Sequence, residues 1–327
     1  TFANDPLQST SEEVDMTKLH DLADLGQSVW LDYIRRSFIA SGEMQALIDA
    51  GVTGMTSNPA IFEQAIAGSD DYDEELRKLA ASEASTIEIY EKLAIDDVRG
   101  AADLLRPVYE RTARADGYIS LEVNPKLAYD AQGTAAEARR LFATLDRPNI
   151  MIKVPATEAG IQAIERLIGE GININVTLMF SLAHYDAVAE AYIKGLERLS
   201  ASGGDLSQVS SVASFFLSRI DSAVDVTLGA DGSAEALSLQ GKTAIANAKV
   251  TYQRFLETFS GPRWEALASK GARTQRVLWA STSTKNPAYP DTMYVDELIG
   301  PNTVNTIPPA TLQAFMEHGT PAVTVDK

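Results

Sequence analysis

The chain of 327 residues contains no cysteine and only three histidines. Without cysteine it has no disulfide, no thiolate nucleophile and no cysteine-ligated metal centre. His20, His184 and His318 are scattered without the spacing of metal ligands, so we expect no metal site and no zinc-dependent aldol chemistry. The lack of thiols also fits a reducing compartment, and we expect a cytoplasmic protein.

Positive charge is also scarce, because 28 lysines and arginines face 45 acidic residues and the net charge is −17. Such a chain repels nucleic acid and acidic membrane surfaces, and we expect neither as a partner. Any anionic ligand must therefore be held by a few local cations. The sequence shows no hydrophobic run long enough to span a membrane, and residues 1–20 lack the pattern of a signal peptide.

Motifs of several common enzyme classes are missing as well. The sequence has no GxxxxGK[ST] motif, no GxGxxG motif after a strand and no GxSxG motif. These absences argue against P-loop nucleotide binding, a Rossmann dinucleotide site and a serine-hydrolase elbow.

The sequence does have short apolar runs that alternate with helical patterns as far as about residue 317. Eight predicted strands separated by helices favour a closed parallel (β/α)8 TIM barrel, with an open doubly wound α/β sheet as the alternative. We expect a polar N-terminal lead-in over residues 1–20 and one barrel domain with additional helices over residues 21–327. The predicted strands centre on residues 29–31, 54–56, 119–121, 150–152, 174–176, 209–213, 277–279 and 303–305.

Several helices have recognisable start signals. The sequence from Thr134 to Glu137 has the form of a capping box before an apolar stripe, and Ser181 precedes another stripe. A long helix is predicted from Ser233 to about residue 258, within what reads as the longest connection, between the sixth and seventh strands. The acidic run 70–75 is interpreted as a solvated first helical turn without a function.

Lys153 interrupts the apolar run 150–155, which reads as a buried strand. Burial disfavours the ammonium form of a lysine, and the neutral amine attacks carbonyl groups, so Lys153 is a candidate for a Schiff base. The alternative is a strand-end lysine that reaches solvent or pairs with a carboxylate.

Polar residues recur where the predicted strands end. In a barrel these carboxyl ends surround the active site, so the pattern predicts one polar site at the barrel mouth. The residues are Asp32, Thr56, Asn58, Glu122, Lys153, Asn175, Thr177, Ser214 and the segment 281–285.

The motifs at these positions resemble transaldolase, in particular its longer bacterial subfamily, from about residue 22 to 319. This resemblance implies a (β/α)8 barrel without a cofactor that moves a dihydroxyacetone unit between sugar phosphates in the pentose phosphate pathway. The matching strings are TSNPAIF (56–62), SLEVNP (120–125), IMIKVPAT (150–157), GININVTLMFS (171–181), SVASFFLSRID (211–221), ASTSTKNPAY (280–289) and GPNTVNT (300–306).

The resemblance also implies a role for each matching residue. Lys153 corresponds to the Schiff-base lysine, Asp32 to the acid/base of carbon–carbon cleavage, and Glu122 with Thr177 to the pair that positions a water. The groups that hold the three-carbon unit correspond to Asn58, Asn175 and Ser214, and the phosphate-binding arginine corresponds to Arg219.

The chain departs from shorter transaldolases near the seventh strand, where STSTKN (281–286) stands in place of Ser-Phe-Arg-Asn. Lys285 is expected to replace that arginine as the second phosphate cation, helped by either Ser281 or Ser283. The sequence stops at Lys327, where relatives continue with helical sequence. Some relatives are fused to a sugar-phosphate isomerase, for which 327 residues leave no room.

Two alternatives to transaldolase stay open at this level. One is a cofactor-free fructose 6-phosphate aldolase on the same barrel, and the other is a barrel that binds sugar phosphates without catalysis. Small aldolase relatives carry Gln and Tyr at the positions of Glu122 and Phe216, so Glu and Phe favour transfer. We expect sugar phosphates as substrates and a monomer or homodimer.

Overall fold

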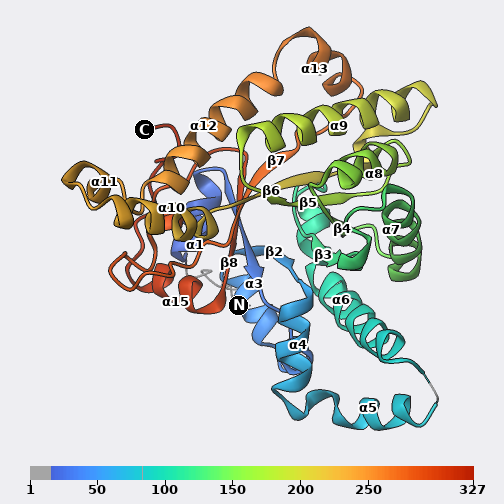
Figure 1. Ribbon diagram of the computed structural model, residues 1–327. Helices are drawn as coiled ribbons and strands as arrows, with labels where there is room; N and C mark the ends of the chain where they lie inside the picture. Colours follow the sequence, from blue (N-terminus) through green and yellow to red (C-terminus); the bar gives the residue numbers. More distant parts are fainter. Residues whose placement is uncertain (1–15, 83) are drawn as a thin grey trace, which may run out of the picture.

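The eight predicted strands form a closed parallel barrel in the order in which they occur along the chain. The computed structural model describes residues 16–82 and 84–327, so the first fifteen residues of the predicted lead-in lie outside the described part (Figure 1). The barrel prediction is confirmed, and the open doubly wound sheet is wrong because β1 pairs with both β2 and β8. The strands are β1 Gln27–Asp32, β2 Val52–Thr56, β3 Ile119–Glu122, β4 Ile150–Pro155, β5 Ile174–Met179, β6 Ser211–Phe216, β7 Arg276–Ala280 and β8 Thr303–Ile307.

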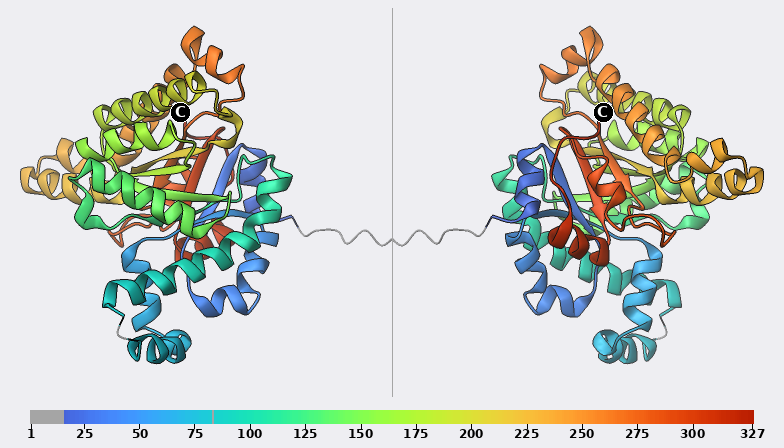
Figure 2. Two further views of the ribbon diagram at one scale, coloured as in Figure 1. Left: turned by 90° about the vertical axis from the view of Figure 1, so that its right-hand side faces the viewer. Right: turned by 90° about the vertical axis from the view of Figure 1, so that its left-hand side faces the viewer.

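Helices surround the strands on the outside of the barrel (Figure 2). None of the described helices has both the length and the apolar character needed to cross a membrane. The α-helices are α1 Lys18–Asp24, α2 Arg36–Ala40, α3 Glu43–Asp49, α4 Pro59–Ala67, α5 Asp73–Ala80, α6 Thr86–Arg111, α7 Ala131–Leu145, α8 Glu158–Ile168, α9 Leu182–Ala201, α10 Ser218–Asp231, α11 Ala234–Ser238, α12 Thr243–Thr258, α13 Gly261–Ala268, α14 Met293–Asp296 and α15 Pro309–His318. Short 3₁₀ turns are η1 Asp70–Tyr72, η2 Pro125–Leu127 and η3 Leu206–Gln208.

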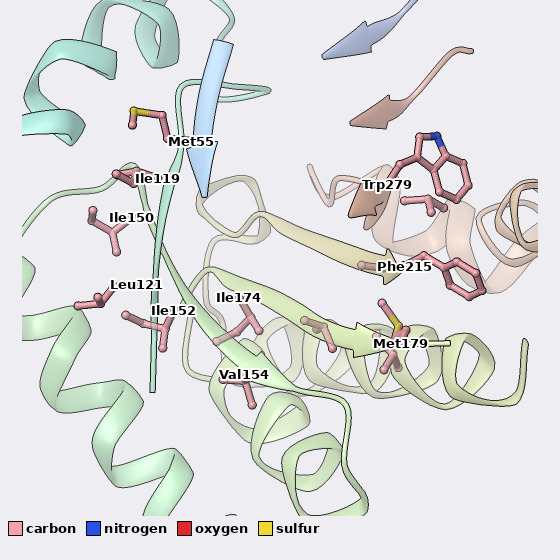
Figure 3. Close-up of a cluster of buried hydrophobic side chains, with 14 of the residues drawn as sticks. Met55, Ile119, Leu121, Ile150, Ile152, Val154, Ile174, Met179, Phe215 and Trp279 are labelled. Carbon is pink, nitrogen blue, oxygen red and sulfur yellow. The ribbon is translucent and has the colours of Figure 1, made fainter. Parts of the chain in front are cut away.

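The main hydrophobic core lies between the strands and the helices. Successive strand residues point to opposite faces, so Ile150, Ile152 and Val154 face the helices together with residues of neighbouring strands (Figure 3). The other face of β4 carries Met151 and then Lys153. A smaller apolar cluster that includes Trp30, Met151, Val212, Leu278 and Val304 fills the barrel interior. The barrel is therefore packed in its middle, and space for a ligand is left only towards its ends.

Three predicted boundaries are wrong for local reasons. Helix α7 begins with Asp130 as its N-cap, whose carboxylate accepts from two backbone amides, so Thr134 lies inside the helix. The predicted helix from Ser233 is broken into α11 and α12 at Gly241, which has φ +70° and lies against the Tyr289 ring. Strand β6 starts at Ser211, two residues later than predicted, because η3 ends at Gln208 and residues 209–210 connect it to the strand. The start of α9 after Ser181 is confirmed, because the Ser181 side chain accepts from a backbone amide of α9.

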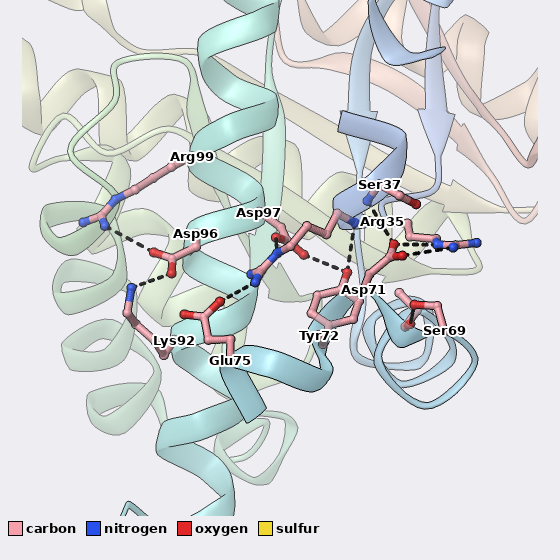
Figure 4. Close-up of polar contacts among 12 residues, drawn as sticks. Arg35, Ser37, Ser69, Asp71, Tyr72, Glu75, Lys92, Asp96, Asp97 and Arg99 are labelled. Carbon is pink, nitrogen blue, oxygen red and sulfur yellow. Dashed lines mark hydrogen bonds and ion pairs between the residues drawn. The ribbon is translucent and has the colours of Figure 1, made fainter. Parts of the chain in front are cut away.

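The longest connection is the one between β2 and β3, over residues 57–118, rather than the one between β6 and β7. It contains the acidic run 70–75, which is only partly a solvated helical turn. Asp71 pairs with Arg35 at 2.8 Å and accepts from the Ser37 amide, while Glu75 pairs with Arg36 (Figure 4). The acidic run thus fixes this connection to the segment that follows β1.

A buried carboxylate lies at the centre of these contacts. Asp97 of α6 is 3% exposed, and it accepts from Arg36 Nε at 2.8 Å and from the Tyr72 hydroxyl at 2.8 Å (Figure 4). Burial raises the pKa of Asp97, while the hydrogen bonds from Arg36 and Tyr72 oppose this shift. Since Arg36 follows Asp32 by only four residues, the cluster anchors the segment that leaves the end of β1.

We predict that Tyr72→Phe lowers the free energy of unfolding by about 1–3 kcal/mol, because buried Asp97 loses a donor and the Arg36 amide loses an acceptor. Urea denaturation measures the change. Tyr129→Phe is the matched control, because Tyr129 is 89% exposed. Equal changes in the two variants would contradict a stabilising role for the Tyr72 hydroxyl.

Candidate active site

A cavity of about 500 Å³ opens at the carboxyl ends of the strands. This is the end at which (β/α)8 enzymes carry out their chemistry. Most of the predicted site residues line it, whereas Asn175 and Lys285 do not. The lining residues are Asp32, Thr56, Asn58, Pro59, Ala60, Ile61, Gln64, Glu122, Pro125, Lys153, Thr177, Leu178, Ser214, Phe216, Arg219, Ala280, Ser281 and Thr306.

Strand register explains why these side chains meet. Glu122 of β3 lies opposite Lys153 of β4, which lies opposite Asn175 of β5. Asp32 of β1 lies opposite Thr56 of β2 in the same way. Because neighbouring residues in register share a face of the sheet, these polar side chains reach the barrel interior together.

Lys153 is 7% exposed, so the reading of a lysine that reaches solvent is wrong. Its Nζ atom lies 3.6 Å from Glu122 Oε2 and donates to the Ser57 carbonyl oxygen at 3.3 Å. Lys153 therefore pairs with a carboxylate, as the alternative interpretation expected, but both residues of the pair line the cavity. A buried amine beside a carboxylate, facing space for a ligand, is an arrangement suited to covalent chemistry.

Asp32 has a different environment. Thr56 Oγ1 donates to Asp32 Oδ1 at 2.7 Å, and the Thr56 hydroxyl also lies 2.6 Å from that of Thr306. Burial raises the pKa of Asp32, while the charge of Lys153 and the Thr56 hydrogen bond partly offset the shift. Thr306 was not among the predicted site residues, although it follows Val304 by two residues and therefore lies on the interior face of β8.

Thr177 brings an unsatisfied hydroxyl to the cavity. Its Oγ1 atom is buried and has no hydrogen-bond partner within residues 16–82 and 84–327. Buried polar atoms are normally satisfied by protein or by water. Since Glu122 and Thr177 come from the strands on either side of Lys153, a water held by Thr177 in the cavity would lie near both carboxylate and amine.

The amide and hydroxyl side chains divide into two groups. Asn58 lines the cavity and also caps α4, because its Oδ1 accepts from the Ile61 amide. Asn175 is fully buried below the cavity, accepting from Ser214 Oγ at 2.7 Å and donating to Ser120 Oγ at 3.0 Å. Asn175 thus orients Ser214, which does line the cavity.

Arg219 lies near the start of α10 with its guanidinium 5.1 Å from the centre of the Phe216 ring. It forms no ion pair with any residue that the structure describes. Asp221 instead accepts from Tyr294 and from the Ala244 amide. An exposed guanidinium on the cavity rim at a helix N-terminus suits an anionic ligand.

Lys285 does not line this cavity. It is exposed, donates to Ser283 Oγ at 2.7 Å and lines a separate cavity of about 240 Å³ with Asp221 and Asp225. Ser281, in contrast, lines the main cavity, with its hydroxyl 2.8 Å from that of Ser218. The two serines therefore differ, since Ser283 contacts Lys285 and Ser281 faces the cavity.

No group of three or more His, Asp or Glu side chains suited to a metal ion occurs in the described ranges.

Comparison with known proteins places the chain among similar sequences of one family. The model of the Transaldolase/Fructose-6-phosphate aldolase family matches residues 29–327. The chain is 52% identical over 302 residues to a transaldolase of Thiobacillus denitrificans, covering 92% of this chain and 84% of that protein. It is 52% identical over 303 residues to a transaldolase of Thermobifida fusca, covering 92% and 82%. It is 51% identical over 310 residues to transaldolase 2 of a Nostoc species, covering 92% and 81%.

The raised pKa of Asp32 predicts how stability depends on pH. Because the folded protein binds the Asp32 proton more tightly than the unfolded chain, the contribution of Asp32 to wild-type stability falls as pH rises from 3.8 through the raised native pKa. Asp32→Asn lacks this loss, so its stability relative to wild type should increase across that window and then level off. Urea denaturation at a series of pH values measures the difference.

Asp24→Asn controls for the removal of one negative charge, because Asp24 is exposed. If wild type instead gains stability relative to Asp32→Asn over the same window, the pKa of Asp32 is lowered and the assignment is wrong.

Proposed function

The chain belongs to the transaldolase/fructose-6-phosphate aldolase family, and on this basis we propose that it is a transaldolase. Family membership confirms the prediction of an enzyme made from the motifs. The proposed reaction transfers a dihydroxyacetone unit from sedoheptulose 7-phosphate or fructose 6-phosphate to glyceraldehyde 3-phosphate or erythrose 4-phosphate. The observation that carries this proposal is the buried Lys153 amine, 3.6 Å from Glu122 in the barrel cavity. We further propose a cytoplasmic enzyme of the pentose phosphate pathway, since the absence of cysteine fits a reducing compartment.

In the first proposed step, the neutral Lys153 amine attacks the C2 carbonyl carbon of the ketose phosphate. Glu122 is the nearest carboxylate to Nζ, and it can take the proton that the ammonium group must lose. Attack gives a carbinolamine, whose hydroxyl must leave as water before an iminium ion forms. Glu122, through a water held by the unpaired Thr177 hydroxyl, supplies the proton for that departure.

In the second proposed step, the iminium ion withdraws electrons and the C3–C4 bond breaks. Asp32 takes the proton of the C4 hydroxyl, and the aldose phosphate leaves. Its raised pKa makes Asp32 a stronger base than an ordinary carboxylate, which suits proton abstraction from a sugar hydroxyl. The three-carbon enamine stays bound to Lys153, where Asn58 and Ser214 can hold its hydroxyls.

Arg219 is the proposed phosphate ligand, because it is the arginine that lines the cavity and it has no carboxylate partner within the described ranges. A guanidinium can contact two phosphate oxygens at once. Lys285 stays a proposed second cation, although it lines a separate cavity beside α10.

Transfer rather than hydrolysis requires that the enamine survives until the acceptor arrives. Phe216 lines the cavity and packs on Phe180 and under Arg219, and its side chain carries no hydroxyl that could protonate the enamine. This favours transaldolase over the aldolase alternative. The grouping of Lys153, Asp32 and Glu122 in one cavity argues against a barrel that only binds sugar phosphates.

Lys153→Ala should lower transfer from fructose 6-phosphate to erythrose 4-phosphate by about 10⁴-fold or more, since no other lysine lines the cavity. A coupled assay of glyceraldehyde 3-phosphate release measures the loss. Lys126→Ala removes an exposed lysine from the adjacent loop and should keep near wild-type activity. Substantial turnover by pure Lys153→Ala protein would rule out the proposed nucleophile.

Arg219→Gln should raise KM for phosphorylated substrates roughly 10-fold or more, from a lost contact of about 1.5–3 kcal/mol. Lys285→Gln removes the same charge outside the main cavity and should raise KM less. Steady-state kinetics with phosphorylated and unphosphorylated acceptors measure both effects. An equal loss on the two kinds of acceptor would argue against phosphate binding by Arg219.

Phe216→Tyr should introduce release of free dihydroxyacetone from fructose 6-phosphate, because a phenol in this wall can mediate protonation of the enamine. Part of the transfer activity should be lost. The measurement is dihydroxyacetone formation without an aldose acceptor, for wild type and variant. If wild type already releases dihydroxyacetone as fast as it transfers it, the protein is an aldolase.

A further inference from the structure

The opposite end of the barrel holds a second cavity, of about 300 Å³, which the proposed reaction does not use. It lies at the amino ends of the strands, and its walls come from the segments that lead into β1, β3, β6, β7 and β8. No acidic residue of the described ranges lines it. Its polar lining includes Tyr118, Ser210, Arg273, Arg276 and Asn302.

Arg276 at the start of β7 is held in place by a network. Its Nη1 atom donates to Ser28 Oγ at 2.6 Å, and Nη2 donates to the Ala115 carbonyl oxygen at 2.8 Å. Asp116 is the carboxylate nearest to it, at 3.5 Å, and is itself 6% exposed. Asp116 also accepts from Trp30 Nε1 at 2.6 Å, so its charge is shared between an arginine, a tryptophan and Ser28.

Within the described part of the chain, the charge of Arg273 is not balanced by a carboxylate in this way. Its Nη2 atom donates to the Ala113 carbonyl oxygen at 2.6 Å, but its Nε atom is buried and has no partner among the residues described. No carboxylate in those ranges lies within ion-pair distance of Arg273. A buried guanidinium N–H without an acceptor is unusual. Arg273 also lines the cavity, so its uncompensated charge is available to an anion that enters there.

We propose that this cavity binds a phosphate group, either as inorganic phosphate or as the end of a small phosphomonoester. A phosphate offers several acceptor oxygens and a charge near −2, which suits two arginines and the surrounding hydroxyl and amide donors. The chain as a whole repels anions, with a net charge of −17, so a cavity lined by two cations and by no acid among residues 16–82 and 84–327 is an exception. The inference does not depend on the chemistry assigned to Lys153.

Trp30 connects this cavity to the catalytic end of the barrel. Its indole contacts Asp116 on one side, and it precedes Asp32 by two residues on the same face of β1. Gly54 allows the indole to pack closely, because a Cβ atom there would lie 2.5 Å from Trp30 Nε1. A phosphate bound by Arg273 and Arg276 would therefore change the surroundings of Trp30, and tryptophan fluorescence can report binding.

The test titrates inorganic phosphate into Arg219→Gln protein at constant ionic strength, so that the proposed cation at the barrel mouth is removed. Tryptophan fluorescence should saturate, and Tm should rise with phosphate concentration. Adding Arg273→Gln should weaken the response at least tenfold. Adding Lys270→Gln instead, which removes an exposed cation three residues away, should leave the response unchanged.

Asn302→Asp is a second variant for the case in which Arg273→Gln impairs folding. It places a carboxylate in the cavity lining, and its left-handed backbone at φ +57° tolerates Asp. This variant should also weaken phosphate binding at least tenfold. A saturable response that survives in either Arg273→Gln or Asn302→Asp would overturn the proposal, as would the absence of any response in Arg219→Gln protein.

Glycerol 3-phosphate, titrated in parallel, distinguishes the two sources of the phosphate group. Tighter binding of glycerol 3-phosphate would assign the cavity to a phosphomonoester, and tighter binding of inorganic phosphate would assign it to the free ion. If neither compound changes fluorescence or Tm in Arg219→Gln protein, the cavity has no phosphate site.

Discussion

A lysine can be kept inside a barrel only if its charge is compensated, and the ion pair of Lys153 with Glu122 meets this constraint. Taking both groups out of water is costly, and removing one partner leaves the other charge buried without compensation. The two residues lie opposite each other on neighbouring strands, so the pairing is fixed by the sheet itself. The same carboxylate that makes the buried ammonium group tolerable is also the group that can take its proton.

The rest of the site is arranged around this pair. Asp32 approaches from β1, where the Thr56 hydroxyl donates to it and Thr306 in turn contacts Thr56, and burial keeps the pKa of Asp32 above the ordinary value. Thr177 carries the unpaired hydroxyl on the other side, while Arg219 occupies the rim. The two carboxylates are thus proposed to differ in function because their surroundings differ, since one is paired with the amine and the other is buried beside a hydroxyl.

The sequence was sufficient to predict the barrel and most of the cavity. Buried strands gave clear apolar runs, and a polar residue at the end of such a run, such as Lys153 or Glu122, has few structural explanations. Features that depend on tertiary contacts were harder to predict from the sequence. The break at Gly241 arises from the nearby Tyr289 ring, and the place of Lys285 depends on the path of its loop. Nothing in the sequence singled out Arg273 as a candidate ligand-binding residue, because a single arginine in a loop looks like a surface residue until its surroundings are known.

The most direct test of the account is to reduce the protein with borohydride in the presence of fructose 6-phosphate and to map the product by mass spectrometry. The account predicts a stable three-carbon adduct on the peptide that contains Lys153, formed only when the ketose phosphate is present. An adduct on Lys126 or Lys285, or no adduct in a protein that is active under the same conditions, would contradict the assignment of Lys153 as the Schiff-base residue.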